Sequence, residues 1–218
     1  MRFFKDLRAA LLNSSDKSTA PVMPSKPPVP QRVEAKVPIA AKKESVIIPF
    51  EGIIQSGTEL TVSGSQFLVA VKDGSVTEVF PAGVHRVNDQ RVAELASSKL
   101  YYISMLENIN RNWNTQGPIR FCDSELGPLS LAAGGTFGYR ICDPVKFIMD
   151  YLNFGASISV EEYTRNLLVN AVKEIISQNN NTSYKGLPMI VTNAAVEARL
   201  AETGIRFSVR IQTVDIVA

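Results

Sequence analysis

Residues 57–87 read GTELTVSGSQFLVAVKDGSVTEVFPAGVHRV, and this stretch decides the fold class of the folded region. Short runs of β-branched and aromatic residues are separated by turn residues, which is typical of antiparallel strands. Asp73-Gly74 predicts a hairpin with a type I′ turn, because both central residues of that turn take positive φ angles. Pro81-Ala82-Gly83 predicts the next turn. Strands are therefore predicted over residues 59–62, 66–72, 75–80, 84–87 and 100–105.

The strand pattern continues as far as residue 141. Three further strands are predicted over residues 119–122, 128–132 and 136–141, and the last is entered through Gly134-Gly135. Together with Gly138, these glycines permit a β-bulge or a close approach of two backbones. They do not predict a phosphate-binding loop, because a strand rather than a helix follows them.

Helical periodicity then replaces the strand pattern. Asp143-Pro144 predicts a helical turn, and Ser159 with Glu162 has the spacing of a capping box at the start of a long amphipathic helix. A second helix is predicted from Pro188 to just before Gly204. A half-buried strand is predicted over residues 205–211. The sequence thus predicts an α+β domain with a β-rich first half, two helices and a returning C-terminal strand.

Residues 1–12, MRFFKDLRAALL, predict a short amphipathic helix with a basic rim. A helix this short needs a surface on which to fold. The surface is an anionic lipid interface in one interpretation, and a partner protein or the chain's own domain in the other. The residues predicted to bind a membrane are Arg2, Phe3, Phe4, Lys5, Leu7, Arg8 and Leu11.

Residues 13–45 contain half of the chain's 12 prolines among Ser, Ala and Lys, which predicts a disordered linker with polyproline character. The folded domain is then predicted over residues 46–218. Residues 1–45 hold nine basic and four acidic residues, whereas the rest holds 14 and 17. A basic arm attached to a near-neutral domain favours an anionic surface for the arm and gives no reason to expect nucleic acid.

The sequence predicts a protein on the cytoplasmic side of a membrane. It contains no run of about 18 apolar residues that would span a bilayer. Charges at residues 2, 5, 6 and 8 interrupt any secretory signal. Cys122 and Cys142 show no metal-binding spacing and are interpreted as buried thiols in a reducing compartment, although a disulfide between them is not ruled out.

Residues for catalysis are few. His85 is the only histidine, so any nucleophile–histidine arrangement must use it, and its strand position favours a structural role. One histidine and two distant cysteines do not supply a zinc site. Trp113 is predicted to anchor a polar loop, and it is a candidate protein contact if its side chain is exposed. No catalytic residue, cofactor or metal is predicted, and the chain is predicted not to be an enzyme.

The stretch 57–87, with its Asp73-Gly74 turn and its Pro81 to His85 corner, resembles the opening of SPFH, or band-7, domains. Trp113-Asn114-Thr115 and the run from Gly138 through Asp143-Pro144 to Phe147 resemble the bacterial membrane-stress branch, also called virion-core-protein-like. Asn114 departs from the glycine usual after that tryptophan. The resemblance covers residues 46–216 and agrees with the α+β prediction.

This resemblance implies a non-catalytic scaffold attached peripherally to the inner face of the cell membrane. Such a scaffold binds inner-leaflet anionic lipid, self-associates and recruits other proteins in an envelope-stress response, with a protein like phage-shock protein A as one expected partner. The sequence lacks the long coiled coil that many such proteins use to build rings and the zinc ribbon of some members of this branch, which argues against large closed assemblies and leaves a dimer or a small oligomer open. The alternative is a protein–protein adaptor whose N-terminal helix docks on a partner rather than on lipid.

Overall fold

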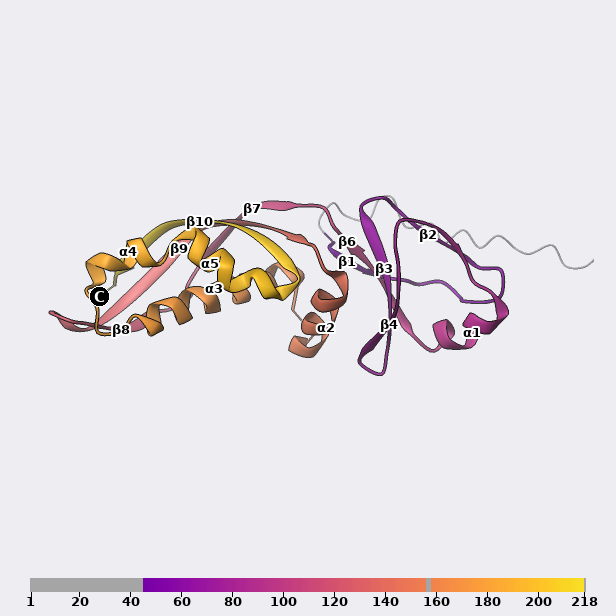
Figure 1. Cartoon of the computed structure of the whole chain (residues 1–218), viewed down its shortest axis with the longest axis horizontal. Helices are drawn as coiled ribbons and strands as arrows, with labels where there is room; N and C mark the ends of the chain where they lie inside the picture. Colours follow the sequence, from indigo (N-terminus) through magenta and orange to yellow (C-terminus); the bar gives the residue numbers. More distant parts are fainter. Residues whose placement is uncertain (1–44, 156–157, 218) are drawn as a thin grey trace, which may run out of the picture. The chain divides into compact units, whose positions relative to one another are not determined.

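The computed structural model describes residues 45–155 and 158–217 of the 218-residue chain (Figure 1). The predicted N-terminal helix and all but the last residue of the predicted linker lie outside these residues. All the helices and strands described here lie in residues 47–216.

The first sheet has four antiparallel strands in the order β1-β6-β3-β4. Its members are β1 (Ile47–Pro49), β6 (Lys99–Ser104), β3 (Gln66–Lys72) and β4 (Ser75–Phe80). Asp73 and Gly74 join β3 to β4 with φ angles of 50° and 76°, which confirms the predicted type I′ hairpin.

Strand β3 is buried on both of its faces. Leu68 and Ala70 point to a cluster that includes the two-stranded sheet of β2 (Glu59–Val62) and β5 (Gly83–Arg86) and helix α1 (Asp89–Ala96). Val69 and Val71 point to the larger core cluster. Burial on both faces explains the uninterrupted apolar run in β3. In a strand with one solvent-exposed face, apolar and polar residues would alternate.

The second sheet has the order β10-β9-β7, and β8 also pairs with β9. Its strands are β7 (Asn108–Asn114), β8 (Ile119–Asp123), β9 (Gly127–Ile141) and β10 (Ile205–Ile216). Strand β9 is one 15-residue strand where two were predicted, so the interruption expected at Gly134-Gly135 is wrong.

The close backbone approach predicted for these glycines is confirmed. The register of β10 against β9 shifts between Ile211 and Thr213, opposite Gly135 and Gly134. A Cβ atom at Gly135 would overlap the carbonyl oxygen of Arg210. The glycine therefore lets the bulged strand lie against β9, and the strand bends without ending.

Helices α2 to α5 lie between β9 and β10 along the chain, and their caps agree with the sequence. Helix α2 (Pro144–Gly155) is a full helix where only a turn was predicted, and Asp143 accepts hydrogen bonds from the amides of Val145 and Lys146, each at 3.0 Å. Helix α3 (Val160–Gln178) begins as predicted, with the Ser159 hydroxyl accepting from the Glu162 amide at 3.1 Å.

The predicted second helix is interrupted. It consists of α4 (Leu187–Ile190) and α5 (Asn193–Leu200), flanked by 3₁₀ turns at Tyr184–Gly186 and Ala201–Thr203. The Thr192 hydroxyl accepts from the Ala195 amide at 3.2 Å and caps α5. A threonine side chain that accepts a backbone hydrogen bond competes with continuation of the helix, and a new helix therefore begins after Thr192.

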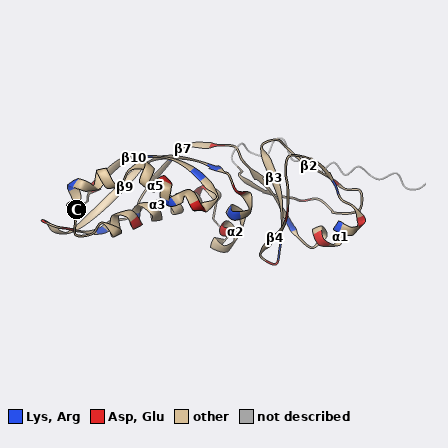
Figure 2. Cartoon of the chain, viewed as in Figure 1, with Lys and Arg blue, Asp and Glu red and all other residues tan. Residues whose placement is uncertain are grey.

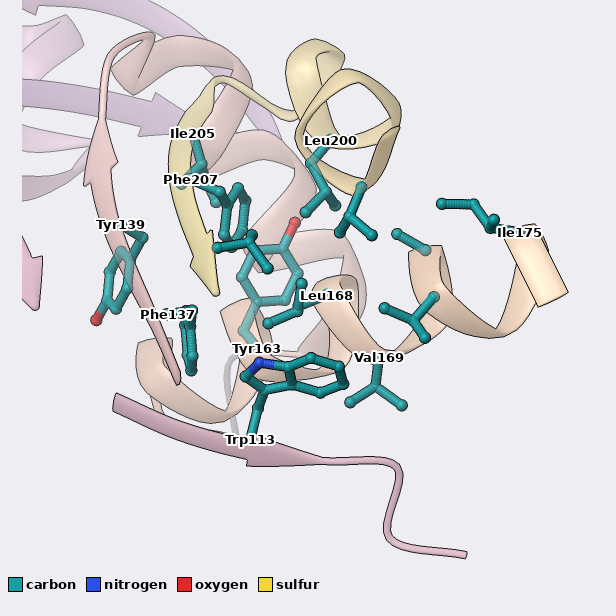
Figure 3. Close-up of a cluster of buried hydrophobic side chains, with 14 of the residues drawn as sticks. Trp113, Phe137, Tyr139, Tyr163, Leu168, Val169, Ile175, Leu200, Ile205 and Phe207 are labelled. Carbon is teal, nitrogen blue, oxygen red and sulfur yellow. The ribbon is translucent and has the colours of Figure 1, made fainter. Parts of the chain in front are cut away.

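The larger core lies between the second sheet and helices α3 and α5 (Figure 3). Phe137, Trp113 and Phe207 come from the sheet, and Tyr163 and Leu168 come from α3, all of them buried. The α+β class with a β-rich first half and a returning C-terminal strand is confirmed. The sequence missed β1, β7 and α1, which are short or polar.

Side chains and a loop bond the backbone at parts of two strands of the second sheet, β10 and β8. Glu197 of α5 accepts the Val209 amide of β10 at 2.8 Å, and Asn193 accepts the Ile211 amide at 3.0 Å. At β8, the Cys122 amide donates to the Asn180 side chain at 3.0 Å and the Cys122 carbonyl accepts from the Asn181 amide at 2.7 Å. These backbone groups are thus already satisfied.

Asp123 holds the β8–β9 turn to the segment before α4. Its carboxylate accepts the amides of Tyr184 at 2.6 Å, Leu126 at 2.8 Å and Glu125 at 2.7 Å. These hydrogen bonds, the Tyr184 bond foremost, hold the pKa of Asp123 below its ordinary value. The carboxylate therefore stabilises the fold above the pKa of an unfolded aspartate, about 3.9, and this stabilisation is lost as the pH falls through the lower folded-state pKa.

We expect Asp123→Asn to lower the melting temperature near neutral pH, because an amide cannot accept at all the positions that the carboxylate does. The difference from the unchanged chain should shrink as the pH is lowered below about 4. Thermal unfolding followed by circular dichroism at a series of pH values measures this. A difference that stays constant down to the acid limit would contradict the assignment.

Candidate functional site

The residues predicted to bind a membrane lie outside the described part of the chain. They are Arg2, Phe3, Phe4, Lys5, Leu7, Arg8 and Leu11. Their predicted role stays a prediction.

Trp113 lies in strand β7, so its predicted loop position is wrong. It pairs with Gly135 of β9 and is 3% exposed, in the same cluster as Leu168 and Val169 (Figure 3). The indole therefore packs in the core and presents no contact surface. The polar residues on either side suggested a loop because they are the outward-facing positions of the strand.

His85 lies in β5, as predicted for a structural strand residue. Its Nε2 atom is 2.7 Å from the Pro81 carbonyl oxygen, and its ring meets the edge of Phe80 at 5.3 Å between centroids. These contacts fix the corner between β4 and β5.

The prediction that both cysteines are buried is wrong. Cys122 and Cys142 are exposed free thiols. In β8, Cys122 takes an outward position between Phe121 and Asp123, which are buried, and Cys142 follows buried Ile141 at the end of β9. The alternation of side chains along a strand therefore places both thiols on the solvent-exposed face.

The structure brings together a pocket that the sequence did not predict, here called the junction pocket. It has a volume of about 440 Å³ and lies where the first sheet meets the second sheet and helices α2 and α3. It is lined by Ser45, Val46, Ile47, Tyr101, Arg111, Tyr139, Ile148, Tyr151, Leu152, Ser159, Val160 and Glu161.

Arg111 is the charged residue of the sheet that enters this pocket. It pairs with Phe137 and lies two residues before Trp113, so its side chain is on the core-facing side of β7. A register shift between Asn108 and Arg111, with Asn110 at φ 57°, sets this orientation. A charged residue on the core face of a sheet is uncommon unless it is paired.

The pairing of Arg111 is incomplete. Its Nη1 atom lies 3.4 Å from a carboxylate oxygen of Glu161, whereas the other oxygen of Glu161 lies 2.7 Å from Arg165. The buried Nε of Arg111 has no hydrogen-bond partner among the described residues. One carboxylate thus serves two guanidinium groups, and the cluster keeps a net positive charge.

Tyrosines supply the polar walls of the pocket. Burial raises the pKa of Tyr139 to about 12, and the negative charge of Glu161 adds to the shift. Burial also raises the pKa of Tyr151, whose hydroxyl donates to the Ile158 carbonyl at 2.6 Å. Both phenols therefore stay neutral at physiological pH.

The lining of the junction pocket combines apolar side chains of α2 and β1 with the ion pair of Arg111 and Glu161. Mostly apolar pockets with a few polar groups are typical of small-molecule binding sites. Within the described ranges, no group of His, Cys, Asp and Glu residues is placed to hold a metal ion. The pocket was not predicted from the sequence, because its walls come from segments more than 100 residues apart.

Charges of both signs are interspersed along the described helices and strands (Figure 2). Among these residues, no helix is both long and apolar enough to cross a bilayer.

Comparison with known proteins identifies the family. No curated protein matches the chain. A family model described as SPFH domain-Band 7 family matches residues 48–216, which is most of the chain and includes every strand and helix described above except the first residue of β1. The chain therefore belongs to the SPFH domain-Band 7 family.

Proposed function

We propose that the chain is a non-catalytic scaffold held on the inner face of the cell membrane, where it self-associates and gathers partner proteins during envelope stress. The match to the SPFH domain-Band 7 family over residues 48–216 carries this proposal, because proteins of the family are membrane-associated and generally not catalytic. A partner like phage-shock protein A fits the bacterial membrane-stress branch that the sequence resembles.

The membrane contact in this proposal is made by residues 1–12. Phe3, Phe4, Leu7 and Leu11 enter the lipid interface, and the bases beside them meet anionic head groups. Each base near an anionic surface contributes about 1 kcal/mol, so one copy is a modest anchor. Self-association would strengthen the attachment, because several weak anchors bind together.

Flotation with anionic liposomes tests this anchor. The full chain is expected to float with the vesicles, less so as salt screens the head groups, and the double variant Phe3→Ser/Phe4→Ser is expected to stay in solution. Met189→Ser is the matched control, because Met189 is 83% exposed and its loss removes a similar apolar side chain from the domain.

Flotation of the double variant at the level of the unchanged chain would refute the lipid role of residues 1–12. If the unchanged chain itself does not float, then lipid is not its direct ligand. That result would favour the adaptor alternative, in which the N-terminal segment docks on a partner protein.

A further inference from the structure

We propose that the junction pocket binds a single-chain anionic amphiphile, with its acid group at Arg111 and its hydrocarbon chain against α2 and β1. This goes beyond the scaffold function, which needs no ligand inside the domain.

The charges beside this pocket favour an anion. Arg111 and Glu161 line the pocket, and Glu161 is shared with Arg165 behind it, so the three groups together carry one net positive charge. Residues 159–161 at the start of the 19-residue helix α3 also line the pocket, and the amino end of the helix adds positive potential that Glu161 and Glu162 of the same turn offset in part. An arginine donates in a planar fork that matches a carboxylate or a phosphate.

Position makes Arg111 the group that would meet the anion. Its side chain is 29% exposed, so part of the guanidinium reaches the pocket although the Nε atom is enclosed. Its contact with Glu161, at 3.4 Å, is longer than the 2.7 Å contact of Arg165. Arg165 also donates to the Asn112 carbonyl at 3.3 Å and is the better satisfied of the two.

The rest of the pocket favours a hydrocarbon chain. Ile148 and Leu152 of α2, Ile47 of β1 and Val160 of α3 form its apolar walls. The volume of about 440 Å³ lies in the range of small-molecule sites, roughly 300–1,000 Å³. A hydrophilic anion would not contact these apolar walls, and a neutral hydrocarbon would leave the pairing of Arg111 incomplete.

The test is a titration of the full chain with decanoate, kept below its micellar concentration, followed by calorimetry. Trp113 gives a second readout, because it is the only tryptophan and lies two residues from Arg111 on the same face of β7. We expect saturable binding of one decanoate per chain with a change in tryptophan emission. Decanol, the neutral counterpart, is expected to bind at least tenfold more weakly. Decyl phosphate tests whether the acid group is a phosphate.

Two variants assign the binding to this pocket. Arg111→Gln removes the charge, and Leu152→Phe narrows the apolar part while keeping every charged group. Each is expected to weaken decanoate at least tenfold, whereas Arg120→Gln, at an exposed position on β8, should bind as the unchanged chain does. Circular dichroism checks that each variant is folded.

Tight binding of decyl phosphate with weak decanoate binding would keep the proposal and make the ligand a phosphate ester. Equal affinity for decanol and decanoate, or unchanged decanoate affinity in a folded Leu152→Phe variant, would overturn it. If the Phe3→Ser/Phe4→Ser variant no longer floats but binds decanoate as the unchanged chain does, then the pocket binds its ligand independently of the N-terminal anchor. That result supports both proposals.

Discussion

Phe147→Ala is expected to lower the free energy of unfolding by about 3–5 kcal/mol, because it removes a fully buried aromatic side chain. Phe147 has no exposed surface, and its ring lies 5.9 Å from that of Tyr151 and 6.3 Å from that of Tyr163 between centroids. The rings join α2 to α3. Truncation therefore leaves a cavity at their contact that the surrounding side chains can only partly fill.

Phe154→Ala is the matched control for this variant. Phe154 is also in α2 and also meets Tyr163, at 5.4 Å between centroids, but it is 52% exposed. Removing its ring should lower the free energy of unfolding by about 1 kcal/mol, which is the contribution of an aromatic pair at a partly exposed site. Urea unfolding followed by tryptophan fluorescence measures both values. Equal losses would mean that Phe147 does not occupy a core position.

Gly135→Ala is expected to lower the free energy of unfolding by about 3 kcal/mol or more, which is at the upper end of overpacking effects. The new methyl group would overlap the carbonyl oxygen of Arg210, which is backbone and cannot rotate away. Relief requires β10 to separate from β9 at the bulge. Hydrogen exchange should therefore show faster exchange of the neighbouring β9 and β10 amides, besides a lower urea midpoint.

Gly64→Ala provides the comparison at a glycine with open space. A Cβ there would have no heavy atom within 4 Å, and Gly64 is not among the residues of the described chain with a positive φ angle. The substitution should leave stability unchanged or raise it by up to about 1 kcal/mol, because it restricts the unfolded chain. A Gly135→Ala variant as stable as Gly64→Ala would contradict the described packing of β9 on β10.

Features set by neighbouring residues could be predicted from the sequence. The Asp73-Gly74 turn and the Ser159 cap depend on groups within three positions of each other, and both were placed correctly. Helix α3 was also predicted, because its apolar stripe runs the length of the helix.

Features set by distant contacts could not be predicted. Strand β9 passes through Gly134 and Gly135 without a break because β10, some 75 residues later, bulges against it. The thiols of Cys122 and Cys142 face outward because of strand alternation, although free cysteines are usually buried.

The junction pocket shows the same limit. Its cation depends on a bulge at Asn110 that no local pattern marks, and Glu161 reaches Arg111 only after the helix has packed on the sheet. The local pattern identifies Ser159 and Glu162 as a helix cap and indicates no role for Glu161 or Arg111. The one signal for the pocket in the sequence was Arg111 itself, a charged residue two positions before Trp113 in a polar segment.

The bonded parts of β10 and β8 restrict how copies of this chain can join. A strand from a neighbour pairs with a sheet by bonding free backbone amides and carbonyls. Glu197 and Asn193 already accept from the Val209 and Ile211 amides of β10, and the segment at Asn180 and Asn181 bonds the backbone of Cys122 in β8. At these positions the sheet cannot be extended from one molecule into the next unless α5 or the 180–182 segment first moves away. Copies that meet at these positions must therefore contact each other through side chains, and such a contact can separate without breaking a shared sheet.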